Sequence, residues 1–323
     1  MSVRERILAA LERADGSICD DCMVSSAQIK HRQQSNSNCR QLTDEKRILR
    51  GRGLCLACKR IKKVNARRDR PSVSDPRTLA PASGPSRLDL GSVDLERSIL
   101  EFLHGNAATG ARGRGPRDRY ASFDYCFNYF QSFREADATE TLVSPEHLQQ
   151  SCLQLGFYLA SWGMLRGSTF LLKHSLAIYE PVVRAVARMD PAVWGIDAHC
   201  YTEENVTKLL ECRKNIRAAF GDENRASDTL VTKVMLGVFG NVPAFDTFVC
   251  TALSELLGVR SFGRRSLRAL GRFYEAHSDV IERHRVPTLA FATGGETRRR
   301  YTRAKVLDMA FFIRGQQRDR QRD

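Results

Sequence analysis

The sequence predicts a mainly α-helical protein with two folded parts, a small N-terminal domain and a larger all-helical C-terminal domain. Apolar residues recur at helical spacing through most of the chain, and no long stretch alternates as a half-buried strand does. Residues 70–89, RPSVSDPRTLAPASGPSRLD, are rich in proline and serine and lack an apolar period, which is typical of a linker. We therefore place the domains at residues 1–68 and 91–323, with a linker at 69–90.

Positive charge is concentrated near the N-terminus. The chain has a net charge of +14, and its first 70 residues hold 17 Lys and Arg against 8 Asp and Glu. This balance favours a polyanionic partner, double-stranded DNA, although a merely soluble basic protein has the same composition. No apolar run has the length of a membrane span, and Arg and Glu interrupt the first apolar segment, unlike a secretory signal. We expect a cytoplasmic protein.

The order of elements in the N-terminal domain predicts a winged helix-turn-helix. Residues 3–13 have helical period, and residues 25–47 suggest a short helix, a turn and a longer helix. Residues 48–66, ILRGRGLCLACKRIKKVNA, suggest a hairpin with Gly51 and Gly53 in its turn. The longer helix, 32–47, would be the recognition helix that enters the major groove.

The recognition helix and the hairpin carry the side chains that DNA recognition needs. Asn and Gln can read adenine, Arg can read guanine, and Lys and Arg on a hairpin suit phosphate contacts. A solvated polar helix is the alternative. The predicted DNA-contacting residues are Arg32, Gln33, Gln34, Asn36, Asn38 and Arg40 on the helix, and Arg50, Arg52, Lys62 and Lys63 on the hairpin.

Two CxxC pairs, CDDC at 19–22 and CLAC at 55–58, lie in the same domain. Each pair places two thiolates on one tight turn, and two pairs complete a tetrahedral site, so we predict a structural zinc ion bound by Cys19, Cys22, Cys55 and Cys58. Four free buried thiols are the alternative, and Cys39 is expected in the core. The domain resembles zinc-bearing winged-helix modules at the N-terminus of some bacterial DNA-acting and defence proteins.

The segment FGNVPAFDTFVC, residues 239–250, is the most informative part of the C-terminal domain. It predicts a helix that ends near Gly240, a turn through Asn241 to Pro243, and a second helix that starts at Asp246. A carboxylate among apolar residues is costly to bury without a partner. Asp246 is therefore either the N-cap of a core helix or a catalytic carboxylate placed at a helix start.

This segment resembles the helix-hairpin-helix DNA glycosylases, in which a short turn with proline precedes an aspartate and an apolar helix. The resemblance implies that Asp246 is catalytic. It would stabilise the positive charge that develops on the sugar when a base, flipped out of the duplex, is released. Tyr125, Tyr129, Tyr158 and Trp162 are candidates for the base pocket, although any single aromatic residue is more often part of the core than of a pocket.

The sequence departs from that family in three respects. The family's hairpin is Gly-rich, whereas residues 222–230, DENRASDTL, contain no glycine, so a hairpin contact to phosphate is in doubt. The nucleophilic lysine of bifunctional members has no counterpart, because Asp228 lies in that neighbourhood and Lys233 falls within a helix. Cys250 is the last cysteine, so no iron–sulfur cluster is implied. We therefore expect a monofunctional glycosylase.

Two Arg-rich segments, 105–119 and 293–309, either contact phosphates or are simply solvated; the second contains Arg298, Arg299, Arg300 and Lys305. The chain contains no P-loop, dinucleotide fingerprint, HExxH or GxSxG motif. A non-enzymatic alternative is a zinc winged-helix regulator, or an adaptor of a defence locus, with a helical sensing or dimerisation domain. The glycosylase hypothesis leaves open whether the substrate is damaged DNA or modified phage DNA.

Overall fold

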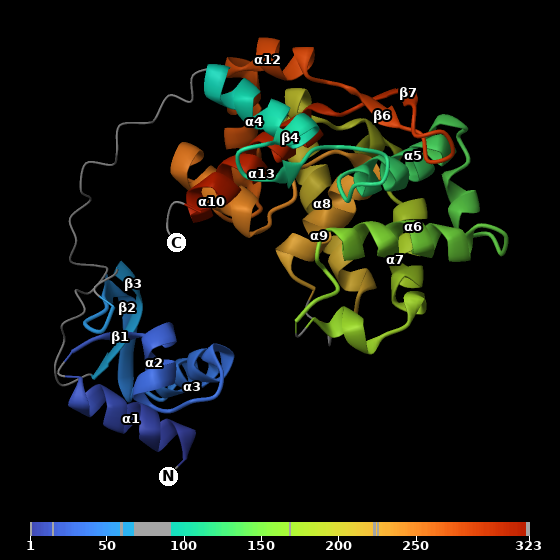
Figure 1. Cartoon of the computed structure of the whole chain (residues 1–323). Coiled ribbons are helices and arrows are strands. Elements are labelled where there is room, and N and C mark those ends of the chain that lie inside the picture. Colours follow the sequence, from blue (N-terminus) through green and yellow to red (C-terminus); the bar gives the residue numbers. More distant parts are fainter. Residues whose placement is uncertain are drawn as a thin grey trace. The chain divides into compact units, whose positions relative to one another are not determined.

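The computed structural model describes residues 2–14, 16–58, 61–67, 92–167, 169–221, 224 and 226–320. The chain divides into two compact units, Met1–Arg87 and Leu88–Asp323, and each is described by itself. The described residues form thirteen α-helices and a few short strands, so the prediction of a mainly α protein is confirmed (Figure 1). The predicted linker at 69–90 lies outside the described residues.

The N-terminal unit packs three helices against a small sheet. A capping box of Ser2 and Glu5 starts the first helix, and that helix buries Ile7 and Leu11 in the core. The three strands are antiparallel in the order β1-β3-β2. The elements are α1 (Val3–Arg13), β1 (Ile18–Cys19), α2 (Asp20–Ser26), α3 (Arg32–Asp44), β2 (Ile48–Leu54) and β3 (Ile61–Arg67).

The predicted position of the hairpin turn is wrong. Gly51 and Gly53 lie inside β2, and the connection to β3 comes later, at 55–60, where the second CxxC pair sits. Gly53 serves close packing: a Cβ there would lie 3.1 Å from Cγ2 of Val64. The long helix also ends earlier than predicted, at Asp44, because the chain leaves it through Lys46 in the left-handed conformation.

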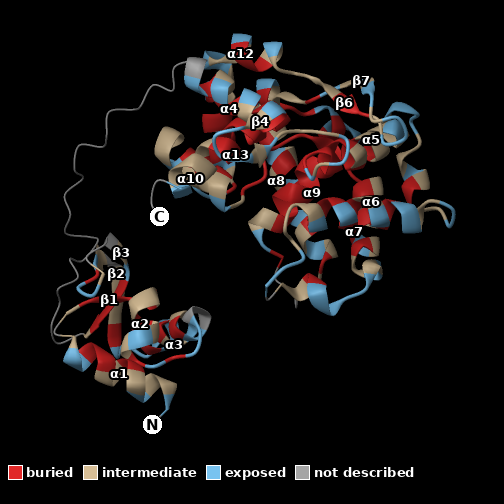
Figure 2. Ribbon diagram, in the orientation of Figure 1, coloured by how far each residue is buried: buried red, intermediate tan, exposed pale blue. Residues whose placement is uncertain are grey.

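The C-terminal unit is built around α9 (Asp228–Phe239), which is buried along most of its length (Figure 2). Helices α5 (Ala121–Glu135), α6 (Leu148–Ser161) and α8 (Glu203–Ala219) pack on it. A Cβ at Gly237 would collide with the ring of Tyr158, so this glycine lets α6 approach α9 closely. The other α-helices are α4 (Ser92–His104), α7 (Glu180–Ala187), α10 (Thr247–Leu257), α11 (Arg264–Ala276), α12 (Ser278–Arg283) and α13 (Arg303–Arg320).

The prediction that the C-terminal domain lacks strands is wrong. It contains two antiparallel hairpins, β4 (Gly105–Asn106) with β5 (Ala111–Arg112), and β6 (Pro287–Leu289) with β7 (Glu296–Arg300). β4 and β5 are too short to show a pattern. β7 does alternate, but its two less exposed residues are Thr297 and Arg299, so no apolar period reveals it.

Helices α10 and α13 approach each other very closely. A Cβ at Gly315 of α13 would collide with the carbonyl oxygen of Phe248 in the first turn of α10. The missing side chain at Gly315 therefore sets the position of the start of α10, and Asp246 immediately precedes that helix.

We predict that Gly315→Ala destabilises the C-terminal unit. In an unhindered helix this change adds up to about 1 kcal/mol of stability; here overpacking should outweigh that gain and lower the free energy of unfolding by about 2 kcal/mol. Thermal unfolding by calorimetry measures the loss. Gly195→Ala is the control, because nothing lies within 4 Å of a Cβ at that position. Equal stability of the two variants would contradict the prediction.

Candidate functional site

The two CxxC pairs come together in the N-terminal unit. Cys19 ends β1, Cys22 lies in α2, and Cys55 and Cys58 lie in the connection that follows β2. Their four Sγ atoms all lie within 4.8 Å of one another. Four sulfur donors at this spacing can hold one metal ion tetrahedrally, so the donor set fits the predicted cofactor.

The electrostatics of the cluster favour a bound cation. Burial opposes ionisation of the Cys55 thiol, but hydrogen bonds from backbone amides, including that of Cys19 at 3.3 Å, lower its pKa to about 6. Burial and the neighbouring thiols raise the pKa of Cys22. Burial also raises the pKa of Cys19, so Cys19 and Cys22 become thiolates near neutral pH only if a positive charge lies among the sulfur atoms. Cys39 is a core residue, as predicted; burial raises its pKa to about 11.

Arg50 is not a phosphate contact, and this prediction is wrong. Its side chain is 4% exposed and forms a bidentate ion pair with Asp20, with N···O distances of 2.9 and 2.6 Å. It also donates to Asn65 at 2.7 Å and to Asn36 at 3.1 Å. The guanidinium thus joins α2, α3 and the sheet, and it engages the side chain of Asn36, another predicted contact.

The remaining predicted DNA contacts are more accessible. Gln34 and Arg40 are exposed on α3, and Asn38, half-buried, donates to the carbonyl of Gln34 at 2.8 Å. Lys63 is exposed on β3, whereas Lys62 pairs with Asp21 at 2.9 Å and stays 35% exposed. The side chains of Arg32, Gln33 and Arg52 lie outside the described residues.

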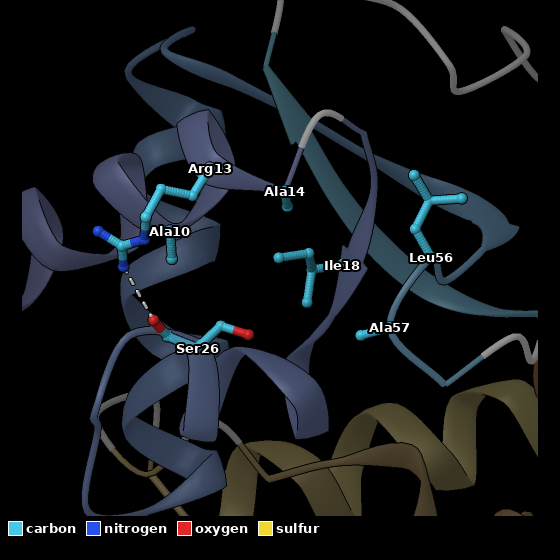
Figure 3. A pocket seen from close by; sticks show the side chains of 7 residues that line it. All are labelled: Ala10, Arg13, Ala14, Ile18, Ser26, Leu56 and Ala57. Carbon is cyan, nitrogen blue, oxygen red and sulfur yellow. Dashed lines mark hydrogen bonds between the residues drawn. The ribbon is translucent and has the colours of Figure 1, made fainter.

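A pocket of about 370 Å³ opens beside the second CxxC pair (Figure 3). Leu56 and Ala57, which lie between the two cysteines, face α1 across it. Arg13 closes one side and donates to the carbonyl oxygen of Ser26 at 3.1 Å. The lining is mostly aliphatic; its residues are Ala10, Arg13, Ala14, Ile18, Ser26, Leu56 and Ala57.

In the C-terminal unit, Asp246 is the N-cap of α10. Its Oδ1 accepts hydrogen bonds from the amides of Phe248 and Val249, both at 3.0 Å. The preceding helix ends as predicted at Gly240, which adopts a left-handed conformation with φ of 66°. The carboxylate is thereby fixed in position at a helix start, with its side chain 13% exposed.

Lys233, which lies in α9, is the second charged residue of this site, and its pairing with Asp246 was not predicted. Its Nζ lies 3.3 Å from Oδ2 of Asp246 and donates to the carbonyl of Trp162, also at 3.3 Å. Burial lowers the pKa of Lys233, although Asp246 opposes the shift. A lone charge inside the apolar helix TLVTKVMLGVF could have signalled a buried partner.

Of the four predicted base-pocket residues, Trp162 lies beside this pair. Its ring is 5.2 Å from Nζ of Lys233. Tyr158 is a buried core residue at 2% exposure. The hydroxyl of Tyr125 donates to the carbonyl of Pro116, and that of Tyr129 shares a hydrogen bond with Ser151.

Trp162 belongs to an aromatic stack that the sequence analysis did not anticipate. Its ring lies 5.4 Å from that of Tyr120, which stacks at 4.2 Å on Phe102. Nε1 of Trp162 is buried without a hydrogen-bond partner in the described part of the chain. The stack therefore places an unsatisfied donor and the Trp162 ring beside Lys233, which in turn pairs with Asp246.

Lys305 is neither a solvated residue nor a phosphate contact, so both expectations for it are wrong. Its side chain is 0% exposed, and its Nζ pairs with Asp308 at 2.9 Å. The rings of Phe102, Phe123 and Trp162 lie 4.6–5.1 Å from the same Nζ. Asp308 in turn accepts from the amide of Ala244 at 2.9 Å, so Lys305 supports the loop that leads to Asp246.

Comparison with known protein families, curated proteins and solved structures finds no match to this chain. None of the helices in the described ranges is long and apolar enough to cross a membrane.

We predict that Asp246→Asn destabilises the unit in a pH-dependent way. Asn can still cap α10, but Lys233 loses the carboxylate that offsets its burial. Because the pKa of Lys233 in the folded state lies below its usual value of 10.5, the unfolded chain binds more protons between these two values, and stability rises with pH there. Asp246→Asn should lower the pKa of Lys233 in the folded state further, so stability should rise more with pH in the variant than in the wild type.

The expected loss at pH 7 is about 2 kcal/mol, and it should shrink as the pH approaches 10.5. Urea unfolding curves of wild type and variant between pH 7 and 10 measure it. Asp190→Asn is the control, because Asp190 also caps a helical turn but is exposed. A loss that is independent of pH would show that Lys233 does not depend on Asp246.

Proposed function

We propose that the protein is a monofunctional DNA glycosylase that hydrolyses the N-glycosidic bond of a modified or damaged base and uses Asp246 as its catalytic carboxylate. The observation that carries this proposal is the position of Asp246: two amides and Lys233 hold it at the start of α10, next to the Trp162 stack. A fixed carboxylate beside ring surfaces suits base excision, because the base must stack while the sugar becomes positively charged.

The residues of the site have separate roles in this mechanism. Asp246 stabilises the developing cation at C1′ and orients or deprotonates the water that attacks it. Trp162, whose side chain is half-buried, offers a ring surface to the flipped base. The amine of Lys233 is engaged by the carbonyl of Trp162 and by Asp246, so it positions the carboxylate and does not attack the sugar.

The N-terminal unit would anchor the enzyme on duplex DNA as a zinc-stabilised winged helix. Support comes from its order of helices and strands, from the β1-β3-β2 sheet and from exposed polar and basic residues on α3 and β3. A four-cysteine set favours zinc, since zinc prefers tetrahedral sulfur ligands. When bound, the ion would supply structure and not chemistry. Anti-phage defence and repair are both compatible with this arrangement.

A second candidate is a non-enzymatic zinc winged-helix regulator or adaptor. One observation favours it: both oxygens of Asp246 already have protein partners, which a purely structural helix cap explains. A base-release experiment separates the two proposals.

We predict that the purified protein contains about one zinc ion per chain and that Cys55→Ser loses it. Elemental analysis of both proteins checks the stoichiometry. Cys39→Ala is the control, because Cys39 is a buried cysteine outside the cluster of four. A folded protein that contains no metal, or a Cys39→Ala variant that loses the metal equally, would contradict the assignment.

We predict that Asp246→Asn lowers the rate of base release by about 10²-fold or more, while DNA binding is retained, because Asn cannot meet the developing positive charge. The assay measures abasic sites in duplexes with damaged and phage-type modified bases. Strands should break only after alkali, since Lys233, the lysine that pairs with Asp246, is engaged by that carboxylate and by the carbonyl of Trp162.

Asp190→Asn should keep full activity in the same assay. Inactivity of the wild-type protein across a broad panel of bases supports the regulator. Strand cleavage without alkali that persists in Asp246→Asn would rule out the mechanism.

A further inference from the structure

We propose that a pocket between residues 105–119 and the end of α13 binds a phosphate group of the DNA backbone. The pocket has a volume of about 260 Å³. Three arginines line it, Arg112, Arg119 and Arg320, together with a single carboxylate, Asp118. The remaining lining residues are Ala111, Gly113, Tyr120 and Gln316.

The loop that forms one wall of the pocket is a built structure. It folds back through the β4–β5 hairpin, and a Cβ at Gly113 would collide with the carbonyl oxygen of Leu103. Arg114 holds the next stretch: its amide donates to that same carbonyl at 2.8 Å, and its guanidinium donates to the carbonyl of Pro287 at 2.7 Å. Arg112 and Arg119, the two arginines of this loop that line the pocket, therefore project from a fixed backbone.

The charges of the pocket are arranged for an anion. The guanidinium of Arg119 lies 5.1 Å from the ring of Tyr120, and within the described ranges it donates no hydrogen bond and forms no ion pair. Arg112 has Asp118 at 3.5 Å, yet its side chain is 87% exposed. Guanidinium groups match the geometry of phosphate oxygens, and an arginine held against a ring has little rotamer freedom to lose on binding.

The pocket is connected to the Asp246 site by the aromatic stack. The guanidinium of Arg119 is 5.7 Å from the ring of Trp162, and the other contacts of Trp162 lead to Lys233 and Asp246. A phosphate bound by Arg119 would thus belong to a nucleotide next to the flipped one. This deepens the proposed function and rests on it only for the identity of the phosphate as part of DNA.

The experiment compares three single variants of the full-length protein. Arg119→Gln and Arg112→Gln each remove one charge from the pocket. Arg117→Gln removes the same charge from the same loop, but Arg117 is exposed and does not line the pocket, so it is the matched control. Calorimetric titration with pyrophosphate and fluorescence anisotropy with a labelled duplex measure binding at several salt concentrations.

We expect Arg119→Gln and Arg112→Gln each to weaken pyrophosphate binding about tenfold and to reduce the salt dependence of duplex binding by about one phosphate contact. Arg117→Gln should behave as wild type towards pyrophosphate. Asp118→Asn should strengthen both interactions, because it removes the one carboxylate that lines the pocket.

Equal pyrophosphate affinity of the three arginine variants would overturn the proposal that this pocket binds phosphate. If the duplex fails to displace pyrophosphate while a free nucleoside triphosphate does, the site binds free phosphates and the DNA assignment is wrong. Base release is scored separately: if wild type binds through Arg119 but releases no base, the glycosylase proposal fails and the phosphate pocket stands.

Discussion

The C-terminal unit depends on one constraint: the loop between α9 and α10 is buried, so its backbone polar groups need partners from the protein. Residues 241–245 are all buried. Thr232 accepts from the amide of Phe245, Asp308 accepts from that of Ala244, and Tyr201 donates to the carbonyl of Asn241. These partners come from α9, α13 and the segment before α8. They fix the path of the loop, and with it the position of Asp246 at the start of α10.

Satisfying that loop brings charge into the core. Asp308 can accept from the loop only if its own charge is balanced, and buried Lys305 balances it at 2.9 Å within a cage of aromatic rings. Lys233 balances the charge of Asp246 in the same way, with its Nζ 3.3 Å from Oδ2 of that carboxylate. Removing one partner of such a pair is destabilising, because it leaves an uncompensated buried charge. The two lysines are therefore best understood as supports of the two carboxylates, one structural and one a candidate for catalysis.

The small N-terminal unit also depends on a buried ion pair. A domain of this size buries a limited core, and its helices are tied to its sheet by the Arg50–Asp20 pair. The four cysteines bring the end of β1 and the start of α2 close to the connection between β2 and β3. Arg50, which was predicted to contact DNA from its charge and its place on the hairpin, thus has a structural role. The candidates left for DNA are those exposed on α3 and β3.

Local sequence determined the features that depend on near neighbours. The end of α9 at Gly240, the cap at Asp246 and the pairing of cysteines within each CxxC motif all follow from a few adjacent residues, and the structure has them. The surroundings of each charge were decided by tertiary structure. Arg50 and Lys305 each lie in a short stretch that looks like an ordinary surface sequence, and Lys233 lies in an apolar helix that does not show which residue pairs with it. Each of the three is buried against a carboxylate. A charged side chain is buried only where pairing with an opposite charge offsets the free energy of removing it from water. Which helices pack together decides whether such a partner is in reach. A short window of sequence does not contain the position of that partner.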